Sequence, residues 1–396
     1  LLFMKMAEEH SKPPFLYLDP LPRGYDWASL LSKHDEDLLE HYERILRRLG
    51  QRKDLFGAIY KHALSKFRDP EKFEKLLNEI NQVEWPKFDT DVKGDAYEGL
   101  LERTASEGKA GAGQYFTPRA LVDAIVEVMG LSVDDTVCDP ACGTGGFLLA
   151  AHRTISGSPR LTAAQEKHLS ATAYYGVELV DSVARLCLMN MVLHGIGGQK
   201  SPISIRDALE SPSDQQFDIV LTNPPFGRRS SVTITSEQGA EEREQLSVRR
   251  DDFWTTTSNK QLNFVQHVFT LLKATGRAAV VVPDNVLFEG GAGEIVRREL
   301  LNRTDLHTLL RLPTGIFYAE GVKANVLFFD RKKAADTPAT EKLWIYDLRT
   351  NKHFTLVEKP LQKEDLKDFI RCYNAADRSK RKPTARLKAF TFVEGA

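Results

Sequence analysis

Apolar residues recur at helical spacing between residues 25 and 93, with charged residues between them. The clearest runs are residues 27–31, 38–46, 56–64 and 73–80. Apolar side chains three or four positions apart predict amphipathic helices. Pro86 interrupts the pattern, and the stretch after it is polar. Because this part of the chain carries no chemical motif, we expect residues 1–93 to form a helical domain without a catalytic role.

Short β-rich runs alternate with longer helical patterns between residues 94 and 335. The expected strands are residues 136–139, 175–178, 217–222, 277–283 and 324–329, and the expected helices include residues 182–193 and 263–273. Such alternation predicts an α/β fold, with a doubly wound, mostly parallel sheet that carries helices on both faces. In this architecture ligands bind outside the carboxyl ends of the strands. The residues that follow each strand are therefore the candidates for chemistry in this expected catalytic domain.

The last part of the chain, residues 336–396, contains one strand-like run at 343–348 and a basic run at 378–382. We expect this segment to complete the core and to contact partners. The basic run is typical of a solvated charge cluster, and contact with phosphate groups is the alternative.

Composition narrows the class of protein. A chain of 396 residues predicts two or three domains, and 54 Lys and Arg against 55 Asp and Glu argue against a purely electrostatic nucleic-acid binder. No apolar run reaches the roughly 18 residues that a membrane-spanning helix needs, and four cysteines in so long a chain favour a reducing, cytoplasmic compartment. Since the chain starts at Leu1 without an initiator Met, we expect it to be a piece of a longer protein.

An acidic residue followed by glycines ends the first expected strand of this middle region, in the motif Asp139-Pro140-Ala141-Cys142-Gly143-Thr144-Gly145-Gly146. The glycines allow a tight turn and a close approach of the backbone to a ligand. The Gly-Lys-Ser/Thr ending of a phosphate loop is missing, so a triphosphate fits poorly. A carboxylate at this place suits a ligand with positive charge, such as an amine or a sulfonium. A glycine turn that only joins strand to helix is the competing interpretation.

Two further carboxylates follow strands of the same region. Glu178 ends the second expected strand, where a carboxylate can accept both hydroxyls of a ribose. Asp207 follows a third strand candidate and can accept from an adenine amino group, whereas a solvated Asp at a helix start is the alternative. Cys138 and Cys142 lie in the glycine region without a second Cys/His pair at zinc spacing. We therefore expect no metal site, and a core position for Cys138.

The expected strand at 217–222 runs directly into Asn223-Pro224-Pro225-Phe226. Because prolines lack an N–H, the Asn223 side-chain oxygen and the Pro224 carbonyl form a pair of acceptors at the strand end. Such a pair can bind an –NH2 group by both hydrogens and free its delocalised lone pair for attack on an electrophilic methyl. Phe226 offers a flat face for stacking the base that carries the amine. We expect these four residues to be catalytic; a rigid turn without chemistry is the alternative.

Several motifs in combination resemble one known family. The motifs are Gly113-Gln114-Tyr115-Phe116-Thr117-Pro118-Arg119, the acidic-glycine loop, Asn223-Pro224-Pro225-Phe226-Gly227, Thr257-Ser258-Asn259-Lys260-Gln261, Val282-Pro283-Asp284-Asn285-Val286-Leu287-Phe288 and Leu312-Pro313-Thr314-Gly315-Ile316-Phe317. Together they resemble the N6-adenine DNA methyltransferases, specifically the methylation (M) subunit of prokaryotic type I restriction–modification systems. The resemblance covers about residues 94 to 330 closely and the N-terminal helices more loosely.

The resemblance implies S-adenosyl-L-methionine as cofactor and methyl transfer to N6 of an adenine that is flipped out of duplex DNA. The residues expected at the cofactor site are Gln114, Tyr115, Phe116, Thr117, Pro118, Arg119, Asp139, Gly143, Thr144, Gly145, Gly146, Glu178 and Asp207. In this interpretation Phe116 and Pro118 pack beside the cofactor while Thr117 bonds its carboxylate. Thr117 as a cap and Pro118 in the first turn also predict a helix start, and both roles are compatible.

The resemblance also implies partners. A separate specificity (S) subunit reads the DNA site in an assembly with two M subunits, and a restriction (R) subunit can join. The sequence of this chain therefore does not reveal the recognised DNA sequence or any preference for hemimethylated DNA. The polar segment 228–252 is expected to be a mobile loop that closes over DNA, and a C-terminal partner-binding tail is expected beyond the chain.

Two other functions fit the same residues. The proline turn can equally bind a protein glutamine or an RNA base for methylation. A protein that kept the fold without the chemistry would be a non-catalytic assembly scaffold, although intact Asn223, Pro224 and Phe226 argue against this.

Overall fold

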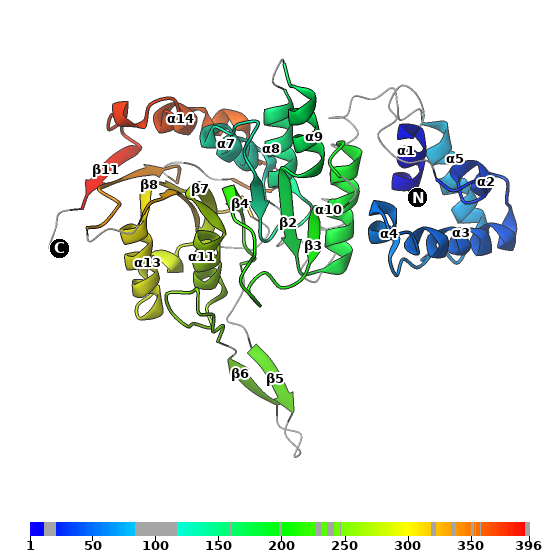
Figure 1. The fold of residues 1–396 in the computed structure, drawn as a ribbon, viewed down its shortest axis with the longest axis horizontal. Helices are drawn as coiled ribbons and strands as arrows, with labels where there is room; N and C mark the ends of the chain where they lie inside the picture. Colours follow the sequence, from blue (N-terminus) through cyan, green and yellow to red (C-terminus); the bar gives the residue numbers. More distant parts are fainter. Residues whose placement is uncertain are drawn as a thin grey trace.

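The computed structural model describes residues 1–11, 21–83, 117–157, 160–197, 200–226, 247–317, 322–333, 337–349, 352, 354–356 and 358–392, and the backbone of residues 231–235 and 241–245. Its N-terminal helices are α1 (Leu2–His10), α2 (Trp27–Leu31), α3 (Asp35–Gly50), α4 (Leu55–Tyr60) and α5 (Pro70–Gln82). They lie together at one end of the molecule, beyond α10 (Asp181–Leu193) (Figure 1).

Polar caps start several of these N-terminal helices. The side chains of Asp26, Asp54 and Asp69 accept backbone N–H groups in the first turns of α2, α4 and α5. Helix α3 buries one apolar face, as its residue spacing predicts. The carbonyl of Lys61, just after α4, accepts a hydrogen bond of 3.2 Å from Arg185 of α10. The helical region is thereby joined to the rest of the molecule.

A nine-stranded sheet forms the centre of the molecule, in the order β11-β10-β8-β9-β7-β4-β1-β2-β3. Its strands are β1 (Val137–Asp139), β2 (Tyr174–Glu178), β3 (Ile203–Ile205), β4 (Phe217–Thr222), β7 (Leu272–Pro283), β8 (Thr304–Arg311), β9 (Ala324–Arg331), β10 (Lys342–Asp347) and β11 (Leu387–Thr391). All neighbours from β3 to β7 are parallel, and so are β8 and β10. Strand β9 runs antiparallel to β7 and β8, and β11 runs antiparallel to β10. This mixed, mostly parallel sheet confirms the predicted α/β class.

Alternate residues of the central strands face two separate cores. In β4, Ile219 and Leu221 belong to the core that contains α7 (Arg119–Met129), α8 (Gly146–Ser156) and α14 (Lys363–Tyr373). Val220 belongs to the core that contains α11 (Lys260–Leu271) and α13 (Ala292–Arg303). Figure 1 shows these two groups of helices on opposite faces of the sheet. The doubly wound arrangement therefore follows from the period-2 alternation of strand side chains.

The other helical elements of the described chain are short. They are α9 (Ala163–Ala171), α12 (Asn285–Phe288) and a 3-10 helix at Arg378–Lys380. No helix within the described ranges combines the length and the apolar character that crossing a membrane requires.

Strands also occur where the sequence pattern did not predict them. Strands β5 (Ser231–Thr235) and β6 (Glu241–Gln245) pair as an antiparallel hairpin within the segment 228–252, which was expected to be a mobile loop and in which no strand was predicted. Alternation of Ser and Thr with Val and Ile in β5 is a β-type pattern, which explains the presence of a strand. The hairpin projects away from the sheet (Figure 1). Strands β8 and β11 were also missed, and β10, β11 and α14 show that the C-terminal segment extends the sheet and covers one face.

The parallel strands β1, β2 and β4 end at one edge of the sheet. Asp139 is in register with Gly176 of β2, and Cys138 is in register with Val220 of β4. Because parallel neighbours share their direction, the residues that follow these three strands come together at the same edge. This edge is the place to look for a site.

Candidate active site

A cleft of about 730 Å³ opens at the carboxyl edge of the sheet. Its walls include Glu178 at the end of β2, Asp207 after β3 and Asn223 after β4, together with Phe264 of α11. Ala141 of the acidic-glycine loop lines the same cleft. The fold therefore gathers residues from four separate segments of the predicted site around one cavity.

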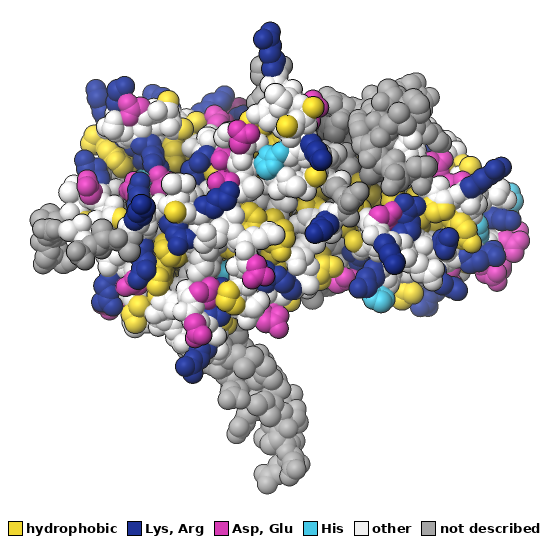
Figure 2. Space-filling view, in the orientation of Figure 1, with side chains coloured by type: hydrophobic (Ala, Val, Ile, Leu, Met, Phe, Trp, Pro, Cys, Tyr) yellow, Lys and Arg dark blue, Asp and Glu magenta, His cyan; other side chains and the backbone are white. Residues whose placement is uncertain are grey.

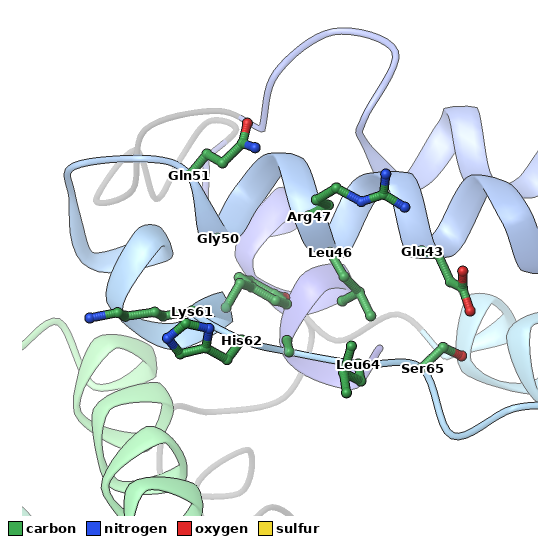
Figure 3. Close-up of a pocket in the computed structure, with 11 residues that line it drawn as sticks. Glu43, Leu46, Arg47, Gly50, Gln51, Lys61, His62, Leu64 and Ser65 are labelled. Atoms are coloured by element: carbon green, nitrogen blue, oxygen red, sulfur yellow. The ribbon is translucent and has the colours of Figure 1, made fainter.

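A second hollow of about 590 Å³ lies among the N-terminal helices. Figure 3 shows Arg47 of α3 on one side of it and Lys61 and His62 on the other. None of the residues predicted to act in catalysis or cofactor binding lines this hollow. The candidate active site is thus the cleft at the sheet edge.

The acidic-glycine loop adopts a backbone that glycine makes accessible. Gly143 has φ +54° and Gly145 has φ +93°, both in the left-handed region, and α8 begins directly afterwards at Gly146. A Cβ at position 145 would lie 2.9 Å from the Cys187 sulfur. The loop therefore requires glycine at position 145 for both conformation and space.

Glu178 ties this loop to the end of β2. Its Oε2 accepts the Gly143 N–H at 3.1 Å, and its Oε1 accepts the Val180 N–H at 2.8 Å. A carboxylate oxygen has more than one lone pair, so both oxygens can accept further hydrogen bonds from a ligand. Glu178 is thus placed to shape the loop and to face the cleft at the same time.

Two buried carboxyl groups lie at this edge of the sheet: Glu178 lines the cleft, whereas Asp139 does not line it but directly precedes Pro140, which does. Asp139 is 2% exposed, and its Oδ1 accepts the Ala141 N–H at 3.0 Å. Burial, with a contribution from the charge of Glu178, raises the pKa of Asp139 to about 7. Burial also raises the pKa of Glu178 above its usual value. A ligand with positive charge would relieve this repulsion, which agrees with the expectation drawn from the motif.

Asp207 lies in a turn and not at the start of a helix. Its Oδ1 accepts the Leu209 N–H at 2.9 Å, two residues further on. The alternative that Asp207 begins a helix is therefore wrong, whereas its position on the cleft is compatible with contact to a ligand. Cys138 is fully buried in the core beside α11, which confirms its predicted packing role.

The proline turn presents a side-chain acceptor. The Asn223 Nδ2 donates to Thr117 Oγ1 at 2.8 Å, and this bond fixes the amide. The Asn223 Oδ1 is buried and has no hydrogen-bond partner in the described structure. Buried acceptors without partners are costly, so such an atom at a cleft indicates a ligand that supplies a donor.

The same bond changes the interpretation of Thr117. Helix α7 begins at Arg119 with Pro118 in the cap position, and no side chain caps it. The expectation that Thr117 caps this helix is therefore wrong, because its hydroxyl accepts from Asn223. The predicted cofactor residues Gln114, Tyr115 and Phe116 lie outside the described residues.

Two residues contact the proline turn, and a third caps the helix that carries one of them, although no role was predicted for any of the three. Gln261 donates from Nε2 to the Pro225 carbonyl at 3.2 Å, and Asn259 caps α11 by accepting from the Gln261 and Leu262 backbone N–H groups. The Phe317 ring meets the Phe226 ring at a centroid distance of 5.2 Å and an interplanar angle of 85°. All three lie in motifs that were visible in the sequence, but only the fold shows what they contact.

No group of three or more His, Cys, Asp or Glu side chains among the described residues is arranged to bind a metal ion.

Comparisons with known proteins identify the family of the chain. The chain matches a family model described as N-6 DNA Methylase over residues 88–391. It is 39% identical over 391 residues to the type I restriction enzyme StySPI methylase subunit of Salmonella potsdam, covering 94% of this chain and 70% of that protein. The EcoKI methylase subunit of Escherichia coli strain K12 shows the same identity and coverage.

Solved structures show the same similarity. The crystal structure of the type I restriction enzyme EcoKI M protein aligns with a TM-score of 0.61 at 32% identity, over 98% of this chain and 80% of that chain. A chain from a structure of a type I R-M system, solved to explain complex assembly and conformational transition, aligns with a TM-score of 0.77 at 26% identity, over 98% and 80% of the two chains.

Proposed function

The chain belongs to the N-6 DNA methylase family, among the methylase subunits of type I restriction enzymes, and from this premise we propose how its cleft transfers a methyl group to adenine. It is an adenine-specific DNA methyltransferase and the modification subunit of a restriction–modification system. Membership in this family implies S-adenosylmethionine as the methyl donor. This identity also argues against a protein glutamine or an RNA base as substrate, and against a scaffold without activity.

We propose that S-adenosylmethionine binds in the cleft at the sheet edge. Its sulfonium supplies an electrophilic methyl group. The buried carboxyl groups of Asp139 and Glu178 favour a ligand with positive charge, and Glu178 retains lone pairs for ribose hydroxyls. The left-handed backbone of Gly143 and Gly145 forms the tight turn of the loop whose residue Ala141 lines the cleft. Asp207 lines the same cleft, in a position that suits the adenine amino group of the cofactor.

The unpartnered Asn223 Oδ1 is the observation that carries the catalytic proposal. It lies next to the Pro224 carbonyl along the chain, and together they accept both hydrogens of the adenine amino group. Pulling these hydrogens away from the ring plane localises the nitrogen lone pair, which then attacks the methyl group. When bound, S-adenosylmethionine would supply the methyl group, so that the N–CH3 bond would form as the S–CH3 bond breaks, and the methylated amine would afterwards lose a proton to water. Positioning contributes most of the rate, so no strong general base is required.

The target adenine reaches this turn only outside the double helix. Its amino group is stacked and paired in duplex DNA, so the base must be flipped into the cleft. Phe226 stacks on the flipped base, with Phe317 fixing the Phe226 ring from one side. Asn223, Pro224, Pro225 and Phe226 are thus proposed as the catalytic turn.

Type I methylase subunits take part in larger assemblies, and we propose the same for this chain. A specificity subunit reads the DNA sequence, two copies of this chain join one specificity subunit, and a restriction subunit can bind the assembly. Among the described side chains on the face in Figure 2, basic and acidic ones are interspersed. DNA affinity is therefore expected to come mainly from the assembly.

Adenine methylation mapping tests the proposed function. DNA from cells that contain this protein and its specificity subunit should carry N6-methyladenine at a defined site, and DNA from cells that lack either one should not. Labelled methyl groups offered to the purified assembly with DNA, RNA and protein should enter DNA. Label that enters protein alone would overturn the proposal.

A further inference from the structure

The loop between β8 and β9 contacts the catalytic turn. Its described first part, residues 312–317, ends at Phe317, which is 6% exposed and packs edge-on against Phe226. Gly315 in this loop has φ +83°, and a Cβ there would lie 2.0 Å from the Phe354 carbonyl oxygen. The orientation of Phe226 therefore depends on where this loop is held.

One guanidinium holds both ends of the loop. Arg349, just after β10, donates from Nε to the Leu312 carbonyl at 2.9 Å and from Nη2 to the Ala324 carbonyl at 3.2 Å. Leu312 begins the loop and Ala324 begins β9, and the Leu312 N–H donates to the Ala324 carbonyl at 3.0 Å. The Arg349 side chain is only 19% exposed, so water competes little for these bonds.

The same guanidinium is anchored on Asp284, at the end of β7. Nη2 donates to Asp284 Oδ1 at 2.6 Å, and Nη1 donates to Oδ2 at 3.3 Å. Asn325, which is fully buried, donates to Asp284 Oδ1 at 2.7 Å and accepts from Nη2 at 3.1 Å. Although burial alone would raise it, the pKa of Asp284 is lowered by the Arg349 and Asn325 donors. The carboxylate is therefore ionised at neutral pH, and a charged pair joins four strand ends.

We propose that Arg349, together with Asp284 and Asn325, forms a clamp that positions the catalytic turn for methyl transfer. The clamp holds the loop of Phe317 against Phe226, so that the stacking surface for the flipped base exists before DNA binds. This inference rests on the proposed stacking role of Phe226. None of the three clamp residues lines the cofactor cleft, so cofactor binding does not depend on the clamp.

The acceptors around Arg349 require a planar guanidinium with several N–H donors, and a positive charge alone is not sufficient. Arg349 serves a carboxylate, an amide oxygen and two carbonyls in different directions, which the planar guanidinium with its five donors can do. A Lys ammonium is a compact point charge and cannot span these acceptors together. An Arg349→Lys variant should therefore behave like Arg349→Met.

Arg277 of β7 is a matched control, because it lies at the edge of the sheet opposite to the cleft. Arg277 of β7 donates to the Met129 carbonyl at 3.0 Å, to the Gly130 carbonyl at 2.8 Å and to Asp135 at 3.1 Å. It thus makes the same kinds of bonds as Arg349, but away from the cleft and the catalytic turn. Loss of general stability would affect Arg277→Met and Arg349→Met alike, whereas loss of positioning would affect Arg349→Met alone.

The test uses the assembly with its specificity subunit and compares wild type, Arg349→Met, Arg349→Lys and Arg277→Met. We measure kcat, the KM for S-adenosylmethionine, and the fluorescence of 2-aminopurine placed at the target adenine. Both Arg349 variants should lose about 10²-fold in kcat, the cost of a misplacement near 1 Å, with the cofactor KM unchanged and the 2-aminopurine signal altered. Arg277→Met should keep the wild-type kcat.

Equal kcat losses in Arg349→Met and Arg277→Met, or a wild-type kcat in Arg349→Met, would overturn the clamp. If Arg349→Met does not fold, Asp284→Asn and Phe317→Leu must show the same selective loss of kcat, or the proposal is wrong. Failure of the wild-type assembly to methylate adenine would instead contradict the proposed function, so the two failures are distinguishable.

Discussion

Asn223 uses its two amide atoms for two different purposes. Its nitrogen is bound to Thr117 in front of α7, while its oxygen is buried without a partner in the described structure. The first contact prevents the amide from rotating, so the second atom keeps a constant direction. A side chain that is fixed by one end and unsatisfied at the other is prepared for a ligand.

Replacing Asn223 by Ala removes this prepared acceptor. We expect the rate of methyl transfer to fall by about 10³-fold, the range seen when a single transition-state hydrogen-bonding group is deleted. Binding of S-adenosylmethionine, measured by calorimetry, should persist because the carboxylates of the cleft remain. Full methylation activity of Asn223→Ala in an intact assembly would contradict the catalytic assignment.

Asp139 predicts a pH dependence of cofactor binding. Its pKa of about 7, raised by burial and by Glu178, means that the carboxyl group is mostly neutral near pH 6 and mostly ionised near pH 8. A sulfonium binds the ionised form better, so affinity should rise as the pH increases through about 7. Calorimetric titrations at these values of pH measure the effect, and Asp139→Asn should abolish the rise. An equal affinity at both values of pH in the wild type would contradict it.

The basic run at 378–382 was expected to be a solvated charge cluster, but two of its arginines pack against the sheet. Arg381 is 7% exposed, stacks at 4.4 Å over Tyr373 of α14 and donates to Thr308 Oγ1 of β8 at 2.8 Å. Arg378 pairs with Asp330 of β9. Lys382, by contrast, is exposed. The two arginines therefore fasten the 3-10 helix to the sheet, and only part of the run is free to meet a phosphate.

This division predicts unequal effects on stability. Arg381→Ala should lower the free energy of unfolding by about 2–4 kcal/mol, because it leaves buried acceptors unpaired and removes the stacking on Tyr373. Lys382→Ala should change it by less than about 0.5 kcal/mol, as is usual for an exposed side chain. Urea denaturation of both variants measures the difference. Equal free energies of unfolding for the two variants would show that Arg381 is not a structural anchor.

At the scale of the whole molecule, charge is balanced although the substrate is a polyanion. The chain carries 54 Lys and Arg against 55 Asp and Glu, and Figure 2 shows both signs mixed over one face. Phosphate contacts dominate the affinity of most DNA-binding proteins. A chain with this balance therefore depends on its partners for tight binding.

We expect the isolated chain to bind duplex DNA only weakly at physiological salt, with a Kd on the order of 10⁻⁵ M, the range of non-specific binding. Fluorescence anisotropy with a labelled duplex measures this affinity, and the assembly with its specificity subunit on the same duplex is the positive control. Tight, sequence-specific binding by the chain alone would contradict the division of labour between the subunits.

The sequence by itself determined the class of fold, the family and the strand ends that carry the candidate site residues. These features are local: side-chain periodicity separates strands from helices, and the acidic-glycine and proline motifs are continuous stretches such as Asp139 to Gly146. Strand β8 was missed because its leucines at 306, 309 and 310 lie three or four positions apart, a spacing typical of a helix. The hairpin was missed because β5 and β6 have only five residues each, and short strands carry weak periodic signals.

Only the tertiary structure decided which distant residues meet. In the sheet, β9 lies between β7 and β8 and runs antiparallel to both. No local sequence pattern encodes this strand order. This order brings Phe317 against Phe226, Thr117 against Asn223, and Arg349 onto Asp284, across 65 positions of sequence in the last case. Such contacts depend on the packing of the complete sheet. Bringing residues together that are far apart in the sequence costs chain entropy, and this cost is offset only when the surrounding elements pack at the same time.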